Sequence, residues 1–238
     1  MVQYQGFSQY YDELTQDQPY EQWLAIIQQA ASKRDSILDI GCGTGSLTHL
    51  LTDFKHVTGM DLSSDMLAVA SKKASNIRWI EGDMTDFDLG QTYDVITILC
   101  DSLNYIAEKD QVAATFNHVY EHLNDDGTFI FDVHSTYKME TLFANHSYID
   151  ETEHIFLGWD AVKGEEPFSV WHYMTFFELQ NDGSYHRFDE EHYQRTYLRE
   201  DYIDMLENAG FKSISTFYDF DVENQDEQSD RLFFIVKK

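Results

Sequence analysis

The 238-residue sequence predicts an α/β fold in which helices cover both faces of a mostly parallel sheet. Three observations support this class. Three apolar residues, Ile37, Leu38 and Ile40, are followed directly by three glycines at alternate positions. Strand-like and helix-like apolar patterns then alternate as far as about residue 133, which is typical of parallel sheets. After a segment without this alternation, a helical pattern at 199–209 and two strand-like stretches follow.

The first predicted helix lies before the glycines. Pro19 stands where the first turn of a helix tolerates proline, because a nitrogen there has no partner within the helix. Trp23, Ile26, Ile27 and Ala30 follow at the spacing of one helix face. We therefore expect an amphipathic helix packed on the sheet.

The glycine loop at 41–45 follows the first predicted strand and is expected to contact a ligand. Glycine adopts backbone angles that other residues avoid, and without a Cβ it lets the main chain approach a bound molecule. Dinucleotide-binding loops have the pattern G-x-G-x-x-G, whose third glycine would fall at position 46. This chain has Ser46 there and Gly45 one residue earlier. At this point nicotinamide or flavin binding and a plain tight turn remain open. The apolar residues after the loop predict a helix: Leu47, Leu50, Leu51 and Phe54.

The stretch D-I-G-C-G-T-G at 39–45 resembles the first motif of the class I S-adenosylmethionine-dependent methyltransferases, which have a Rossmann-like fold. The resemblance covers about 20–133 and 199–238. It implies a seven-stranded sheet that ends in an antiparallel hairpin. It also implies that the loop, with Gly41, Gly43 and Gly45, holds the aminoacyl and ribose portion of the cofactor. In the same comparison Asp39 orients the methionine amino group.

Two further acids follow predicted strands. Asp61 ends the second strand, twenty residues beyond Gly41, where a carboxylate can accept both ribose hydroxyls. An ordinary strand-end acid is the alternative. Asp83 and Met84 follow the third strand at 77–80. The resemblance implies that Asp83 accepts from the adenine amine and that Met84 packs on the ring, with a core methionine as the alternative.

The N-terminal segment is rich in aromatic residues: Tyr4, Phe7, Tyr10, Tyr11 and Tyr20. Its S-x-x-Y-D-x-L stretch at 8–14 is similar to segments that precede the core in many small-molecule methyltransferases, where an aromatic residue folds over the cofactor. Tyr11 or Tyr20 would take that role, and a helix pinned by its aromatic side chains is the alternative. The complete predicted cofactor-binding set is Tyr11, Tyr20, Asp39, Gly41, Gly43, Gly45, Asp61, Leu62, Asp83, Met84 and Cys100.

The acceptor is expected beyond the fourth strand, an almost entirely apolar stretch at 93–99. Ligands of open α/β sheets bind past the carboxyl ends of the strands, so the segment at 100–105 should face the transferred methyl. Tyr105 is the first catalytic candidate, at a position where related sugar-amine methyltransferases carry a histidine. Because a phenol is mostly protonated at neutral pH, orientation of the acceptor is the alternative to proton abstraction. Asn104 is expected to contact the substrate, and His134, after the fifth strand at 128–133, is the second catalytic candidate.

The segment 134–198 interrupts the alternation. Long aromatic-rich stretches at 154–160, 169–179 and 185–197 predict an antiparallel sheet of about three strands, with a hairpin turn at 181–183. We expect it to form a lid or substrate subdomain inserted into a core of 1–133 and 199–238, whose first 31 residues form a helical cap. Arg195 is a candidate to bind a substrate carboxylate, although a salt bridge to neighbouring acids is the commoner role. The histidines of this segment match no metal-ligand spacing, so no metal is expected.

Composition narrows the function classes. Forty-three acidic and 16 basic residues give a formal charge of −27, which disfavours binding to nucleic acid or anionic membranes. No apolar run approaches the roughly 20 residues of a membrane span. The two cysteines form no paired framework, so we expect a cytoplasmic protein.

We therefore expect a methyltransferase that moves a methyl group from S-adenosylmethionine to an N or O atom of a small molecule. Two alternatives are a regulatory module that binds the cofactor without turnover and, more distantly, a nicotinamide-dependent oxidoreductase. The sequence names neither the acceptor nor the oligomeric state. Aromatic residues of the lid either line the pocket or form the face of a homodimer.

Overall fold

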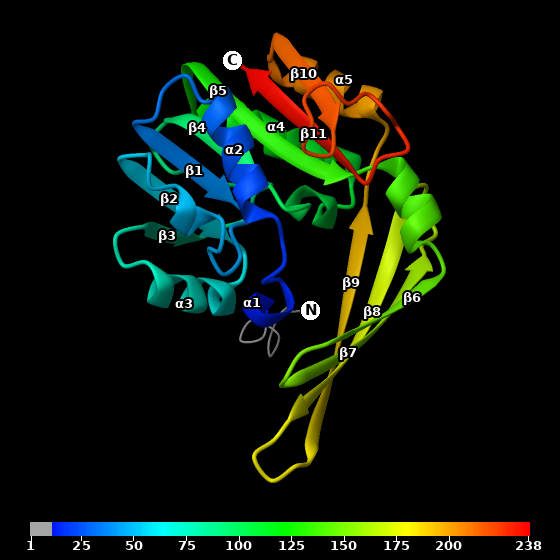
Figure 1. The fold of residues 1–238 in the computed structure, drawn as a ribbon. Coiled ribbons are helices and arrows are strands. Elements are labelled where there is room, and N and C mark those ends of the chain that lie inside the picture. The colour runs from blue at the N-terminus through cyan, green and yellow to red at the C-terminus, as the bar shows by residue number, and fades with distance from the viewer. Residues whose placement is uncertain (1–10) are drawn as a thin grey trace.

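The computed structural model describes residues 11–238, so the aromatic residues Tyr4, Phe7 and Tyr10 lie outside the described residues. Two sheets form the framework (Figure 1). The larger has seven strands in the order β10-β11-β5-β4-β1-β2-β3, and only β11 runs against the others. Its strands are β1 (Ser36–Ile40), β2 (His56–Asp61), β3 (Arg78–Glu81), β4 (Tyr93–Ile98), β5 (Leu123–His134), β10 (Ser213–Tyr218) and β11 (Arg231–Lys237).

Helices pack on both faces of this sheet, which confirms the predicted fold class. Helix α2 (Tyr20–Ala30) buries Trp23, Ile26 and Ile27 on one face, as its apolar spacing predicts. Helices α4 (Lys109–His122) and α5 (Arg199–Ala209) cover the other. Helix α5 ends at Gly210, whose φ of +108° explains the glycine stop. Helix α3 (Ser64–Lys73) begins at Ser63, whose side chain accepts the Met66 N–H.

The predicted helix after the glycine loop is wrong. Only one 3₁₀ turn, η2 (Thr48–Leu50), forms there. Leu47, Leu51 and Phe54 are nevertheless buried against α2 and the sheet. The apolar spacing therefore identified the buried side of the segment, while its hydrogen bonds run mainly over three residues, as in Leu51 N–H to the Thr48 carbonyl.

The second sheet is antiparallel, as predicted, but has four strands in place of three. They are β6 (His146–Glu151), β7 (Ile155–Lys163), β8 (Ser169–Leu179) and β9 (Tyr185–Arg195). Strand β6 was missed because all of its residues are exposed and it lacks an apolar alternation. A π-helical segment, η4 (Lys138–Phe143), connects β5 to this sheet.

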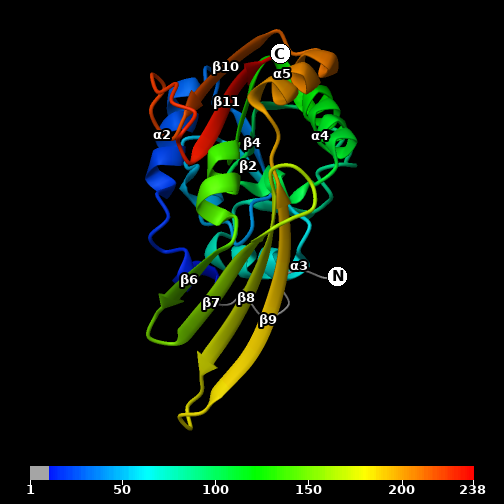
Figure 2. The ribbon, with the colours of Figure 1, turned by 90° about the vertical axis from the view of Figure 1, so that its right-hand side faces the viewer.

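The second sheet lies beside the core and extends past it as the long β8–β9 hairpin (Figures 1 and 2). Its inner face contributes Ile155, Leu157 and Phe176 to an apolar cluster with Met66 of α3 and Tyr11 of the short helix α1 (Tyr11–Leu14). The sheet is thus packed against the carboxyl-end side of the core, although the division into core and lid subdomain stays a prediction. No helix among residues 11–238 is both long and apolar enough to cross a membrane.

Candidate active site

The glycine loop forms a tight bend between β1 and β2. Gly41, Gly43 and Gly45 have φ values of +69°, +54° and +75°, a region that side chains rarely allow. A Cβ on Gly41 would lie 2.6 Å from the Cβ of Ser102, so the loop passes directly against the segment after β4. The bend therefore requires glycine for both its angles and its close approach.

Asp61 fastens this bend to the end of β2. Its carboxylate accepts the N–H of Gly43 and the N–H of Ser63, each at 2.8 Å. Burial raises the pKa of the Asp61 carboxyl, and the backbone donors oppose this rise. Each carboxylate oxygen retains acceptor capacity for a ligand hydroxyl.

A main cavity opens beyond the carboxyl ends of β1 to β4, and a smaller one adjoins it beside the glycine loop. The predicted residues that line the main cavity are Tyr11, Gly41, Gly43, Asp61, Leu62, Asp83, Met84, Cys100 and Tyr105. Tyr20 and Asp39 line the smaller cavity. Gly45 lines neither, because it packs against Trp79 and Ala70. The structure thus gathers nearly all of the predicted cofactor residues around one space, while their individual roles stay predictions.

Asp39 is more enclosed than the resemblance suggests. Its side chain is buried, and its two oxygens accept the hydroxyls of Thr48, at 2.6 Å, and Thr97, at 2.9 Å. Burial raises its pKa to about 6, against the lowering effect of these hydrogen bonds, and the neighbouring Asp61 adds to the rise.

Tyr11 is held at the cavity by its neighbour Asp12, which sequence reasoning did not single out. The Asp12 carboxylate accepts the Thr44 and Ser46 hydroxyls of the glycine loop, at 2.6 and 3.0 Å, and pairs with Lys73 of α3 at 2.6 Å. These contacts explain the aspartate within the S-x-x-Y-D-x-L stretch, because they tie α1 to the loop and α3.

The substrate and catalytic candidates separate into two groups. Tyr105 lines the main cavity, and its ring meets the edge of His192 at 5.7 Å between centroids. His134, Asn104 and Arg195 line neither cavity. Asn104 is buried and joins elements, since its amide donates to the Arg195 carbonyl and accepts the His134 N–H.

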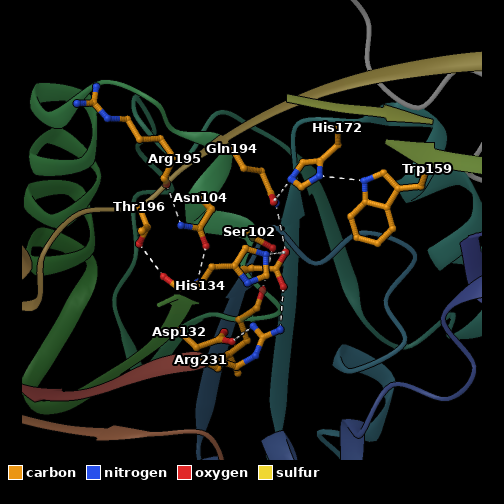
Figure 3. A network of polar contacts seen from close by, with 12 residues as sticks. Ser102, Asn104, Asp132, His134, Trp159, His172, Gln194, Arg195, Thr196 and Arg231 are labelled. Carbon is orange, nitrogen blue, oxygen red and sulfur yellow. Dashed lines mark hydrogen bonds and ion pairs between the residues drawn. The ribbon is translucent and has the colours of Figure 1, made fainter. Parts of the chain in front are cut away.

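Arg195 extends away from the residues around Asn104 (Figure 3). Its guanidinium donates to the Ala107 carbonyl at 3.3 Å and pairs with Glu166 at 3.2 Å. This geometry favours the salt-bridge alternative. Binding of a substrate carboxylate by Arg195 stays a prediction without support from its position.

His134 belongs to a buried polar network that links the two sheets (Figure 3). Its Nε2 lies 3.3 Å from the Asp101 carboxylate, and burial lowers its pKa to about 4. The Asp101 carboxylate also accepts hydrogen bonds from Arg231 of β11 and Gln194 of β9. Gln194 contacts His172, which accepts the indole N–H of Trp159 at 3.0 Å.

The main cavity is also lined by residues that were not predicted as site residues: Asp101, Ser102, Met66 and Ile106. Only two of these had a signal in the sequence, the position of Asp101 and Ser102 in the segment after β4.

The buried histidines predict a pH dependence of stability. Burial lowers the pKa of His172, like that of His134, to about 4, whereas an unfolded histidine titrates near 6.5. Between these values the unfolded chain binds more protons, so stability falls as the pH drops from 6.5 to 4, by about 3 kcal/mol per histidine. Asp39, with its pKa raised to about 6, acts in the opposite direction because there the folded state holds the extra proton.

Urea unfolding between pH 4 and 7 tests this. The free energy of unfolding of the His172→Gln variant should change less steeply with pH than that of the wild type, by the equivalent of one proton taken up on unfolding. Equal slopes would mean that His172 titrates normally in the folded protein.

Comparison with known proteins agrees with this geometry. A family model described as a methyltransferase domain matches residues 37–127. The Bacillus subtilis protein named "Putative methyltransferase YqeM" is 41% identical over 242 residues, which cover 99% of this chain and 97% of that one. The crystal structure of an S-adenosylmethionine-dependent methyltransferase from Clostridium acetobutylicum has a TM-score of 0.88 and 30% identity, and the match covers 98% of each chain. The chain belongs to the class I S-adenosylmethionine-dependent methyltransferases.

Some relatives of this methyltransferase carry more specific names. A Streptomyces fradiae enzyme named as a dTDP-3-amino-3,6-dideoxy-glucopyranose N,N-dimethyltransferase is 33% identical over 109 residues, 45% of this chain and 43% of that one. The structure of CalS10, an amino pentose methyltransferase from Micromonospora echinaspora bound to the cofactor, has a TM-score of 0.77 at 20% identity and covers 100% of this chain and 98% of that one. At that identity the likeness concerns the fold alone.

The residues present fit S-adenosylmethionine, the cofactor of this enzyme class. The described lining of the two cavities contains the carboxylates of Asp39, Asp61, Asp83 and Asp101 and no basic side chain. This negative field suits a cofactor that carries a sulfonium and an ammonium group. Among residues 11–238 no group of three His, Cys, Asp or Glu side chains is arranged to hold a metal ion.

Proposed function

We propose that this methyltransferase transfers the methyl group of S-adenosylmethionine to an N or O atom of a small molecule. The observation that carries the proposal is the main cavity, where the glycine loop, Asp61 and Asp83 share one space with Tyr105 of the segment after β4. The second sheet packs against Met66 and Tyr11, which line this space, so the sheet supports one wall of the volume left for the acceptor. A cavity walled in this way suits a small metabolite better than a macromolecule.

These positions support the following roles in cofactor binding. The loop backbone at Gly41 and Gly43 faces the aminoacyl portion, and Asp61 accepts the ribose hydroxyls. Asp83, whose oxygen already fixes the Thr85 N–H at 2.8 Å, accepts from the adenine amine beside Met84. The remaining residues enclose the cofactor: Tyr11, Tyr20, Leu62 and Cys100.

Catalysis needs chiefly alignment. The cofactor supplies a methyl group that its sulfonium already activates, so the protein gains most by holding the acceptor in line with the methyl. Tyr105 is the side chain placed to orient the acceptor, by a hydrogen bond from its hydroxyl or by ring packing. His134 is buried with its Nε2 3.3 Å from Asp101, which supports a role in holding Asp101 better than a role as the base.

Two further features support a small acceptor. The formal charge of −27 opposes phosphate backbones. The name of the Streptomyces fradiae relative describes a nucleotide-linked amino sugar as the substrate of that protein. The outer face of the second sheet exposes Ile149 and Tyr173. A homodimer formed through this face stays a prediction.

Incubation with methyl-labelled S-adenosylmethionine and a pool of small amines, alcohols, phenols and carboxylic acids tests the proposal. We expect label in the small-molecule fraction and no label in added RNA or DNA. Binding of S-adenosylhomocysteine without transfer to any compound would favour the regulatory module. Label on nucleic acid would contradict the proposed acceptor class.

A further inference from the structure

Asp101 occupies a strained position at the wall of the main cavity. It comes three residues after Ile98, the last residue of β4, and both Cys100 and Asp101 have φ near +56°, a left-handed conformation that is costly for side chains. Its neighbours in the wall are Ser102 and Tyr105. The end of β4 is where the acceptor is expected to meet the methyl group under the proposed function.

Side chains from three elements of the fold hold the Asp101 carboxylate. Arg231 of β11 donates to Oδ1 at 2.9 Å, while His134 of β5 and Gln194 of β9 approach Oδ2, each at 3.3 Å. Arg231 also pairs with Asp132, which is fully buried. The Asp101 side chain keeps 23% of its surface exposed, against 11% for Arg231. Asp101 is therefore the most exposed member of a largely buried chain of ion pairs formed by Asp132, Arg231 and Asp101.

The direction of the hydrogen bonds around Gln194 is determined. The Trp159 indole only donates, so the Nδ1 of His172 that receives it carries no proton. A neutral His172 then carries its proton on Nε2 and donates to Gln194 Oε1 at 3.1 Å. The Gln194 amide group consequently points its N–H toward Asp101, which acts only as an acceptor.

The charge of Asp101 is equally well fixed. Burial alone would raise the pKa of this carboxyl, but His134 and Arg231 outweigh burial and hold the pKa well below its usual range. Arg231 is charged at every relevant pH, so Asp101 stays negative even where His134 is neutral. Asp101, Arg231 and Asp132 together carry one net negative charge, and of these three side chains Asp101 is the one that lines the main cavity with Tyr105.

This charge discriminates between acceptor atoms. A neutral amine attacks with its lone pair, forming the N–C bond while the C–S bond breaks and its electron pair stays on sulfur. Positive charge therefore moves from sulfur to nitrogen, and the ammonium proton leaves afterwards to water. A carboxylate or phenolate acceptor would instead bring a negative charge toward Asp101, which repels it.

We propose that Asp101 is the specificity-determining residue that selects an amine nitrogen as the acceptor, because its carboxylate stabilises the positive charge that develops there. The proposal rests on the proposed function and names its substrate class: small neutral amines. The residue acts through its charge, and the network with Arg231 and Gln194 keeps that charge in place.

A binding experiment measures this charge without knowledge of the acceptor. Sinefungin resembles S-adenosylhomocysteine but carries an ammonium group near the position of the transferred methyl. We expect calorimetry to show that the wild type prefers sinefungin and that Asp101→Asn loses at least tenfold of this preference, with binding of S-adenosylhomocysteine changed by less than about threefold. Gln194→Leu, which removes a support but keeps the charge, should retain most of the preference. An equal preference in wild type and Asp101→Asn would overturn the proposal.

The labelled products supply the second arm. Methyl groups of the wild-type products should be on nitrogen, and Asp101→Asn should lower kcat for amines by on the order of 10². Products methylated on carboxylate or phenol oxygen would refute the selection of amines and leave the proposed function intact. Absence of any product would contradict the proposed function. The preference for sinefungin would still test the role of the Asp101 charge, because it is measured by binding alone.

Discussion

Replacing Arg231 with methionine is expected to lower the free energy of unfolding by about 3–5 kcal/mol, because it leaves a buried carboxylate without its partner. The Asp132 side chain has no exposed surface, and its Oδ1 has no hydrogen-bond partner among residues 11–238. Within the described part of the chain, its Oδ2 would keep only the Trp23 indole N–H as a donor, at 3.4 Å. Chemical denaturation with an unchanged slope against denaturant would measure the loss.

Two variants serve as controls for this result. Arg34→Met breaks an exposed pair with Asp53 and should cost less than about 1 kcal/mol. The double variant Arg231→Met with Asp132→Asn removes both charges and should recover a large part of the stability. A double variant as unstable as the single one would show that the loss comes from the other contacts of Arg231, its ion pair with Asp101 and its packing on Trp23, 5.0 Å from the ring, and not from the charge of Asp132.

The second large effect is expected at Gly45. A Cβ there would lie 2.5 Å from Cη2 of Trp79 and 3.2 Å from the Cβ of Ala70, at a φ of +75°. Left-handed backbone costs about 1–2 kcal/mol for alanine and overpacking adds about 1–3. Gly45→Ala should therefore destabilise the protein by about 2–5 kcal/mol.

Gly43 provides the matched control, because its φ is +54° but a Cβ would meet no heavy atom of the described residues within 4 Å. Gly43→Ala should cost only the backbone share, about 1–2 kcal/mol. Equal losses in the two variants, measured by urea unfolding, would indicate that Trp79 moves aside and that only the backbone angle matters at position 45.

The cofactor side of the site was predictable because its information is local. Each predicted residue stands at a strand end or in the glycine loop, and parallel strands bring their carboxyl ends to one edge of a sheet. Asp61 and Asp83 both line the main cavity for this reason, although they are far apart in the sequence. The same rule indicated the segment after β4, but not which of its side chains would matter.

The acceptor side of the site depends on side-chain contacts between residues that are far apart in the sequence, and a single sequence does not show which of them meet. Asp101 receives its partners from positions 134, 194 and 231, on three strands of two sheets. Arg195 and Gln194 are adjacent in sequence, yet one turns to Glu166 and the other to Asp101 because neighbours on a strand point to opposite faces. Strand β6 escaped detection for a related reason, since its pairing with β7 and not its own pattern makes it a strand.

The affinity of the Asp61→Ala variant for S-adenosylhomocysteine tests most directly whether the glycine bend and its strand-end acids hold the cofactor. Calorimetry should show binding weaker by about 1.5–3 kcal/mol, the loss expected for charge-assisted hydrogen bonds. Glu81→Ala, at the exposed end of β3 in register with Asp61 and outside both cavities, should bind like the wild type. An unchanged dissociation constant in Asp61→Ala would contradict the account.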